Sequence, residues 1–201
     1  DDPNELLDAA ARLTAAGRDV WFGVHPLNGR PDSGRGTVAD VASAKALVAD
    51  LDWDHPTHKT TGLPTEQEIR DRLKLVTLQP RVIVNSGHGL QAYWPLEEPV
   101  TPAEGEALQT ALDDLLSSQG LDNDRGDLAS ILRVPGSVNY KGDPIEVVVE
   151  HHNPRVITLE TIRRVLGDHQ RATRAASTSS GPTTDRGLQA VLAKLEAAGR
   201  D

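Results

Sequence analysis

Aspartates at alternate positions interrupt an apolar segment of the chain. In LVADLDWD, residues 47–54, single residues separate Asp50, Asp52 and Asp54. Because residues i and i+2 of a strand point to one side, Asp50 and Asp52 should lie side by side, with Leu51 facing the core. Adjacent carboxylates repel each other unless a cation lies between them, and hard divalent cations such as Mg²⁺ prefer oxygen ligands. The pair indicates either a metal site or the solvated face of an edge strand.

A glycine-rich segment supplies a second group of candidate residues. NSGHGLQAYW, residues 85–94, predicts a tight turn between two strands, where Gly87 and Gly89 let backbone N–H groups approach a phosphate. Ser86 adds a hydroxyl donor, and His88 could bind a metal, contact a phosphate or transfer a proton. An ordinary hairpin with a solvated histidine would have the same sequence features.

Charged residues are also frequent over residues 121–141, LDNDRGDLASILRVPGSVNYK. A third metal ligand could come from one of three aspartates, Asp122, Asp124 or Asp127. Arg133 lies among apolar neighbours and needs an anionic partner, either a phosphate or a structural aspartate. Lys141 near the end of the segment is either a phosphate ligand or a solvated side chain.

The composition restricts the class of protein. The chain has 201 residues, no cysteine, no methionine and a formal net charge of −9. The absence of cysteine excludes disulfides, thiolate metal sites and cysteine nucleophiles. The negative charge argues against coating of nucleic acid by bulk positive charge, but not against an enzyme with a local basic groove and bound metal ions. Since no segment has the features of a membrane span or a signal peptide, we expect a cytoplasmic protein.

The order of the expected elements predicts an α+β fold with hairpins. Helices are expected over residues 5–17, 65–76, 101–120 and 158–167. Strands are expected over residues 20–24, 45–53, 82–86, 90–94 and 145–152. Thr65, with an acid three residues later, predicts a capping box, and Thr101 followed by proline predicts another helix start.

We expect three parts along the chain. Residues 1–167 form the main domain, residues 168–185 a Ser/Thr/Ala-rich flexible linker, and residues 186–201 a helix that begins a further, truncated module. The absence of methionine, including at position 1, indicates a fragment of a longer chain.

In their order and combination, these motifs resemble the archaeo-eukaryotic primase superfamily, and more closely the primase-polymerase domains of phage and plasmid replication proteins. The resemblance covers about residues 20–141, and RVPGSVNYK together with SGHGLQAYW carries most of it. It implies a central, mostly antiparallel sheet flanked by helices, with an RRM-like catalytic core. It also implies a DNA primase-polymerase that makes or extends primers by template-directed nucleotidyl transfer with two Mg²⁺ or Mn²⁺ ions.

The resemblance implies a role for each acid. Asp50 and Asp52 would be catalytic metal ligands. The third acid of the family falls best on Asp122, and Asp127 is the runner-up.

It also implies a set of nucleotide-binding residues. The Ser-Gly turn of the family falls on Ser86 and Gly87, but Gln91 occupies the position of its strand histidine. Either Gln91 or His88 would then contact the nucleotide phosphate. The remaining residues of this set would be Arg133, Asn139, Lys141 and Arg35.

The implied partners are a single-stranded DNA template, deoxyribo- or ribonucleoside triphosphates, and a helicase in the same polypeptide, without a membrane. One alternative is a divalent-metal nuclease or nicking initiator, for which His55, His88, Tyr93 and Tyr140 are candidates without a convincing spacing. Another is an inert domain that binds nucleotide or origin DNA, which the departure at Gln91 favours. Sugar transferases that use a DxD motif do not fit, because the chain lacks their βαβ opening.

Overall fold

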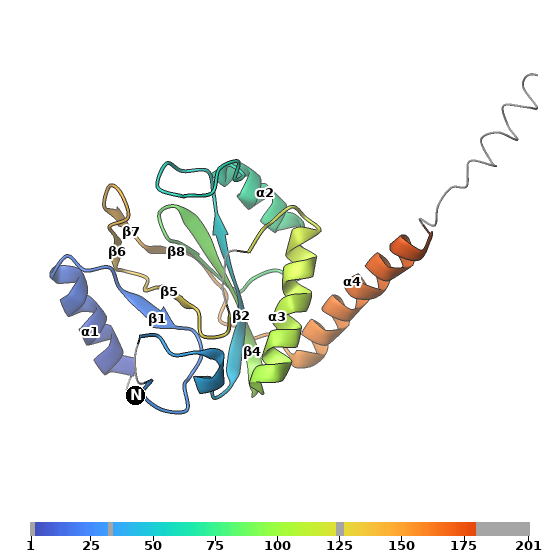
Figure 1. Cartoon of the computed structure of the whole chain (residues 1–201), viewed down its shortest axis with the longest axis horizontal. Helices are drawn as coiled ribbons and strands as arrows, with labels where there is room; N and C mark the ends of the chain where they lie inside the picture. Colours follow the sequence, from blue (N-terminus) through green and yellow to red (C-terminus); the bar gives the residue numbers. More distant parts are fainter. Residues whose placement is uncertain (1–2, 32–33, 124–126, 180–201) are drawn as a thin grey trace, which may run out of the picture. The chain divides into compact units, whose positions relative to one another are not determined.

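A four-stranded antiparallel sheet with the strand order β2-β4-β3-β8 lies at the centre of the fold (Figure 1). Its strands are β2 (Ala44–Asp52), β3 (Val82–Asn85), β4 (Gly89–Val100) and β8 (Val148–His152). The computed structural model describes residues 3–31, 34–123 and 127–179, and the sheet belongs to a compact unit, Asp1–Leu166. Because β2 is an edge strand, one side of its backbone needs hydrogen-bond partners from outside the sheet.

Two short antiparallel ribbons and four helices accompany the sheet among the described residues. One ribbon pairs β1 (Trp21–Gly23) with β5 (Ile131–Arg133), and the other pairs β6 (Val138–Asn139) with β7 (Ile145–Glu146). The helices are α1 (Pro3–Ala15), α2 (Glu66–Leu75), α3 (Pro102–Ser117) and α4 (Leu159–Ser179), and a 3-10 turn covers Val38–Asp40. None of the helices in these ranges combines the length and the apolar character that a membrane span needs.

The two faces of the sheet pack against different partners. On one face, Leu47, Ala49 and Leu51 of β2 join a large core with residues of α2 and α3. On the other face, Ala46 and Val48 join a smaller apolar cluster with residues of β3, β4 and β5. Figure 1 shows α2 and α3 on one side of β2 and the two ribbons on the other. The alternation along β2 therefore decides which residues face the helices and which face the ribbons.

The fold confirms the expected α+β class, with antiparallel strands and flanking helices. The capping box at Thr65 is also confirmed, because Thr65 Oγ1 accepts from Glu68 N–H (3.3 Å) and the Glu68 carboxylate accepts from Thr65 N–H (2.8 Å). At the start of α3, the Thr101 hydroxyl accepts from Glu104 N–H (3.3 Å). Local sequence patterns thus predict where these helices begin.

Several elements differ from the expectation. The strand expected over residues 90–94 extends over Gly89–Val100, and the short strands β5 and β6 were not expected. The strand expected over residues 145–152 is divided at Val147, whose side chain is fully buried and whose N–H donates to the Ser137 carbonyl (2.9 Å). The helix expected to end near residue 167 continues to Ser179, because the first part of the expected linker is rich in helix-forming alanine and arginine. The expected final helix, residues 186–201, lies outside the described residues, so the division into domains stays a prediction.

Gly105 of α3 lies against β2, where an added Cβ would be 2.5 Å from the Cβ atom of the buried Ala44. We expect Gly105→Ala to lower the free energy of unfolding by about 1–3 kcal/mol, although alanine favours helices. Gly167→Ala in α4 is the matched control, because its Cβ would meet only the end of Arg171 at 3.4 Å. The control should raise stability by up to about 1 kcal/mol. Urea unfolding measures both, and a Gly105→Ala variant as stable as the wild type would contradict this packing.

Candidate active site

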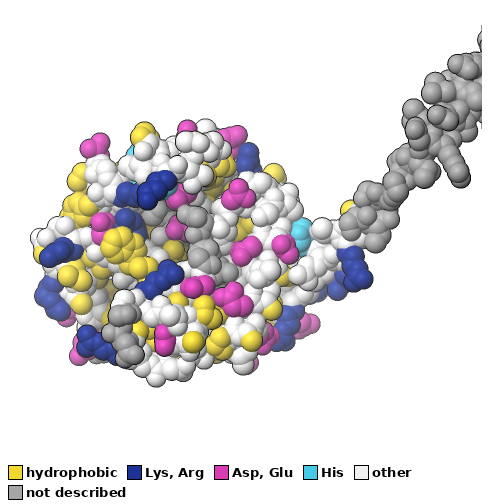
Figure 2. Space-filling model, in the orientation of Figure 1, with side chains coloured by type: hydrophobic (Ala, Val, Ile, Leu, Met, Phe, Trp, Pro, Cys, Tyr) yellow, Lys and Arg dark blue, Asp and Glu magenta, His cyan; other side chains and the backbone are white. Residues whose placement is uncertain are grey.

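Asp50 and Asp52 line the same cavity, on the ribbon side of the sheet. The cavity has a volume of about 200 Å³, and both acids are partly buried. The intervening Leu51 is 1% exposed and packs into the core on the opposite face. Figure 2 shows acidic and basic side chains close together on one face of the compact unit. Strand alternation brings the two acids to one side, as the sequence predicts.

The neighbouring strand leaves room for the second acid. Gly89 of β4 pairs with Asp52 in the register of the sheet. A Cβ at Gly89 would be 2.8 Å from Asp52 Oδ1 and 2.9 Å from the Leu51 carbonyl oxygen, which is closer than real Cβ atoms come. Gly89 therefore permits the close approach of both the Leu51 carbonyl and the Asp52 carboxylate.

Side-chain amides occupy the open edge of β2 beside the acids. Gln109 of α3 accepts from Val48 N–H (2.9 Å) and donates to the Val48 carbonyl (2.8 Å), as a neighbouring strand would. Asn123 accepts from Asp50 N–H (2.8 Å) and donates to the same Val48 carbonyl (3.1 Å). Asp113 accepts from both amides, at 2.8 and 2.7 Å. The network fixes the backbone of the residue that carries the first acid.

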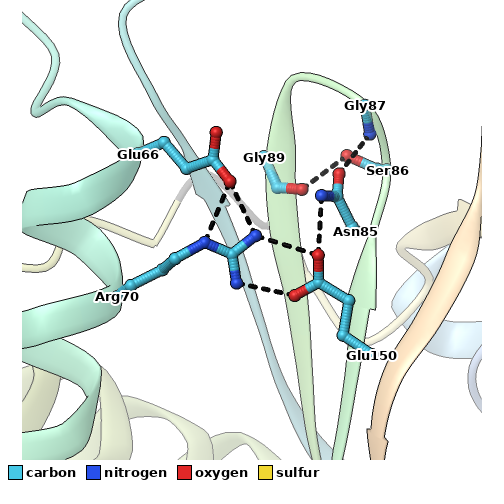
Figure 3. Close-up of polar contacts among 7 residues, drawn as sticks. All are labelled: Glu66, Arg70, Asn85, Ser86, Gly87, Gly89 and Glu150. Atoms are coloured by element: carbon cyan, nitrogen blue, oxygen red, sulfur yellow. Dashed lines mark hydrogen bonds and ion pairs between the residues drawn. The ribbon is translucent and has the colours of Figure 1, made fainter.

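The turn between β3 and β4 is held by its own hydrogen bonds (Figure 3). Ser86 donates to the Gly89 carbonyl from its N–H (2.9 Å) and from its hydroxyl (3.0 Å). Gly87 N–H donates to Asn85 Oδ1 (2.8 Å). The two groups that the sequence suggested as phosphate donors, the Ser86 hydroxyl and the Gly87 N–H, are thus engaged within the turn. Ser86 still forms part of the cavity wall.

An ion-pair network ties this turn to α2 and β8 (Figure 3). Asn85 Nδ2 donates to Glu150 Oε1 (2.8 Å). Arg70 donates to both Glu150 oxygens, at 2.6 and 2.9 Å, and to Glu66 Oε1, at 2.9 and 2.7 Å. The hydrogen bonds from Arg70 hold the pKa of Glu150 below its ordinary value. The network restrains the chain where β3 ends and the turn begins.

Three histidines pack beside the acids. His88 is 2% exposed, and its ring centroid lies 4.0 Å from that of His55. His58 Nδ1 lies 3.0 Å from Asp52 Oδ2, and His58 Nε2 lies 3.2 Å from the His88 carbonyl oxygen. Burial, with the charge of the nearby His55, lowers the pKa of His88 to about 4. His88 is therefore neutral at pH 7 and cannot offer a positive charge to a phosphate.

Two basic residues line the cavity, and they differ in how they are paired. Arg133 Nη1 lies 2.5 Å from Asp19 Oδ1, and Arg133 Cζ lies 4.8 Å from the ring centroid of Trp21. Lys141 is exposed, and its Nζ atom lies 3.4 Å from His58 Nδ1. Because Arg133 is already neutralised by a carboxylate, Lys141 is the better placed cation for a phosphate.

Most of the residues that the sequence singled out meet at this cavity. They are Asp50, Asp52, Ser86, His88, Gln91, Arg133, Asn139 and Lys141. Arg35 and Asp127 instead pair with each other at 3.8 Å, and Asp122 lines a second cavity of about 160 Å³ whose wall also includes Asp52. Within the described residues, no three acidic or histidine side chains lie closely enough grouped to hold a metal ion. Asp124 lies outside those residues, so the identity of the third acid stays a prediction.

Other residues of the site were not foreseen. Trp21, His58 and Ile131 also line the cavity, and Gln109 and Asn123 hold the edge of β2. The sequence offers one signal for His58, its position six residues after Asp52. The two amides carry no local signal, because their partners lie 61 and 73 residues away along the chain.

We expect Gln109→Leu to lower the free energy of unfolding by about 1–3 kcal/mol, because leucine leaves the buried Val48 N–H without an acceptor. Urea unfolding measures the change. Thr110→Ala, the neighbouring exposed position on α3, is the control and should stay within about 0.5 kcal/mol of the wild type. Equal stability of the wild type and Gln109→Leu would show that the amide does not hold the edge of β2.

The low pKa of His88 predicts a pH dependence of stability. Between pH 6.5 and about 4 the unfolded chain binds a proton that folded His88 does not, so stability falls as the pH falls through this window. His88→Asn removes this contribution, as well as the ring Nε2 atom, which is buried without a hydrogen-bond partner in the described part of the chain. The stability difference between wild type and variant should therefore change with pH in this window. His152→Asn, at an exposed position on β8, should change nothing, and parallel pH profiles for wild type and His88→Asn would contradict the assignment.

No protein-family model matches the sequence, and no curated protein matches it. Among solved structures, the primase-polymerase domain of cyanophage S-2L superposes with a TM-score of 0.58 at 14% identity, over 79% of this chain and 76% of that one. The catalytic domain of primase RepB′, in complex with initiator DNA, superposes with a TM-score of 0.52 at 16% identity, over 89% and 80%. A longer RepB′ primase gives a TM-score of 0.51 at 16% identity, over 94% of this chain but only 56% of its own length. The chain therefore has the archaeo-eukaryotic primase-like fold of primase-polymerase domains.

Proposed function

We propose that the chain is a DNA primase-polymerase that joins nucleotides on a single-stranded DNA template. The observation that supports this most directly is the single cavity that holds Asp50 and Asp52 beside Lys141. An acid pair next to a cation is the arrangement that binding of a metal-bound nucleoside triphosphate needs. The primase-like fold adds support, and one solved structure with this fold is in complex with initiator DNA.

The residues of the cavity fit a divalent metal ion. Mg²⁺ in nucleotide-dependent enzymes is commonly held by one or two carboxylates together with substrate phosphates, so Asp50 and Asp52 would suffice as its protein ligands. Asp122, which shares a cavity wall with Asp52, is the proposed further ligand. When bound, two such ions, Mg²⁺ or Mn²⁺, would lower the pKa of an attacking 3′-hydroxyl and offset the charge of the leaving pyrophosphate.

The other cavity residues would bind and orient the triphosphate. Lys141 would offset phosphate charge, which agrees with its exposed position at the cavity. The Tyr93 hydroxyl donates to Gln91 Oε1 (3.3 Å), and this bond leaves the amide N–H₂ of Gln91 as the group to meet a phosphate. Asn139 Nδ2 donates to the Ser86 carbonyl (2.6 Å) and would keep the turn in place. Gln91 would replace the family histidine as a neutral hydrogen-bond donor.

A second candidate function is an inert domain that binds nucleotide or DNA and recruits a helicase. The observation that favours it is that, among the described residues, no three acidic or histidine side chains are grouped closely enough to hold a metal ion. A helicase in the same polypeptide is expected under both functions and rests on the resemblance alone. The two functions differ in one respect that can be measured, which is extension of a primer.

We expect the wild-type chain to extend a primed single-stranded template with deoxynucleotides and Mn²⁺, and Asp50→Asn to slow this extension by at least about a hundredfold. Asparagine keeps the shape of the side chain but removes the charge that would hold the ion. A gel assay of primer length measures the rate.

Asp54→Asn is the matched control, because Asp54 continues the alternation but is exposed and lies outside the cavity wall. It should extend primers at the wild-type rate. Extension by Asp50→Asn at the wild-type rate would refute the assignment. Shortening of the primer by the wild type would indicate a nuclease, and binding without extension would favour the inert domain.

A further inference from the structure

One wall of the candidate active site is apolar, although the rest of the cavity is polar. Among the described residues that line it, Trp21 of β1 and Ile131 of β5 are the apolar members, and they are 45% and 36% exposed. The other lining residues carry carboxylate, imidazole, hydroxyl, amide or cationic groups. In Figure 2, apolar, basic and acidic side chains also lie next to one another on the face shown. The cavity therefore has the two kinds of surface that a nucleotide needs, one for its base and one for its phosphates.

The register of the β1–β5 ribbon places the apolar residues of this wall on one face of the ribbon. Trp21 pairs with Arg133, and Gly23 pairs with Ile131, so these four positions share one face of the ribbon. Gly23 has no side chain, and a Cβ added there would meet nothing closer than the His25 carbonyl oxygen at 3.7 Å. Because Gly23 is the other β1 residue on this face, no side chain of β1 flanks the ring of Trp21 there.

The ring of Trp21 is supported by a fixed cation. Arg133 Cζ lies 4.8 Å from the ring centroid, and the guanidinium is held at 2.5 Å by Asp19 Oδ1. The same Asp19 oxygen accepts from Tyr140 N–H (3.1 Å), so the carboxylate is held from two sides. Arg133 is 8% exposed, whereas Trp21 keeps nearly half of its surface in contact with solvent. Arg133 therefore positions the Trp21 ring and does not serve as a phosphate ligand.

We infer that Trp21 is the stacking platform for the base of the nucleoside triphosphate whose phosphates lie at Asp50, Asp52 and Lys141. This inference rests on the proposed function, because it takes the same cavity as the nucleotide site. Every base can stack on an aromatic ring, since each base has a π-face. The platform holds all four nucleotides, purines more tightly than pyrimidines because of their larger rings, and leaves the choice among them to the template.

The test compares binding of dATP with binding of inorganic tripolyphosphate, each with Mg²⁺, by isothermal titration calorimetry. Trp21→Ala should weaken dATP binding about tenfold or more and leave tripolyphosphate binding unchanged, since only dATP has a base to stack. Trp21→Phe should bind dATP within about threefold of the wild type, because it keeps an aromatic face. Phe22→Ala is the matched control: Phe22 is the next residue on β1, is 38% exposed and lies outside this cavity wall.

Tryptophan fluorescence gives a second readout. Trp53 and Trp94 are 7% and 0% exposed, so quenching on addition of dATP should come from Trp21 and disappear in Trp21→Phe. Thermal unfolding of each variant shows whether it remains folded.

Three results would overturn the inference. They are a folded Trp21→Ala that binds dATP like the wild type, a folded Trp21→Ala that loses both ligands equally, and a wild type that does not bind dATP. A wild type that binds dATP through Trp21 but does not extend primers would instead refute the proposed polymerase and leave the platform standing.

Discussion

Strand β2 has to place apolar side chains in the core and two carboxylates in a cavity within the same nine residues. The two-residue period of a strand makes this possible, because Leu47, Ala49 and Leu51 face α2 and α3 while Asp50 and Asp52 face the ribbons. A register shift of one residue would exchange the two sets and bury the acids. The position of the whole candidate site therefore depends on the register of β2.

Three features of the structure secure that register and the position of the acids. The side-chain amides of Gln109 and Asn123 satisfy the open edge of β2, and Asp113 holds both amides. On the other side of the strand, Gly89 leaves space for the Asp52 carboxylate. These contacts fix the backbone around the acids before any ligand binds, and preorganised groups of this kind stabilise developing charge better than mobile ones do.

Local patterns in the sequence predicted the parts of this fold that depend on neighbours along the chain. The capping box at Thr65, the hairpin between β3 and β4 and the shared face of Asp50 and Asp52 are of this kind. The parts of the fold that depend on residues far apart in the chain could not be predicted from local patterns. Arg133 was expected to need an anion, but only the folded chain shows that the anion is Asp19, 114 residues away. The edge amides, whose partners on β2 lie 61 and 73 residues away along the chain, are likewise not encoded in any local periodicity.

The proposed nucleotidyl transfer depends on binding of a divalent ion by both acids of β2 together. A crystal of the chain grown with Mn²⁺ and dATP tests this most directly, because the anomalous scattering of manganese locates the ion. We expect manganese within bonding distance of a carboxylate oxygen from each of Asp50 and Asp52, with triphosphate oxygens completing its coordination. Manganese and nucleotide bound elsewhere, with the cavity between β2 and the β1–β5 ribbon empty, would contradict the account.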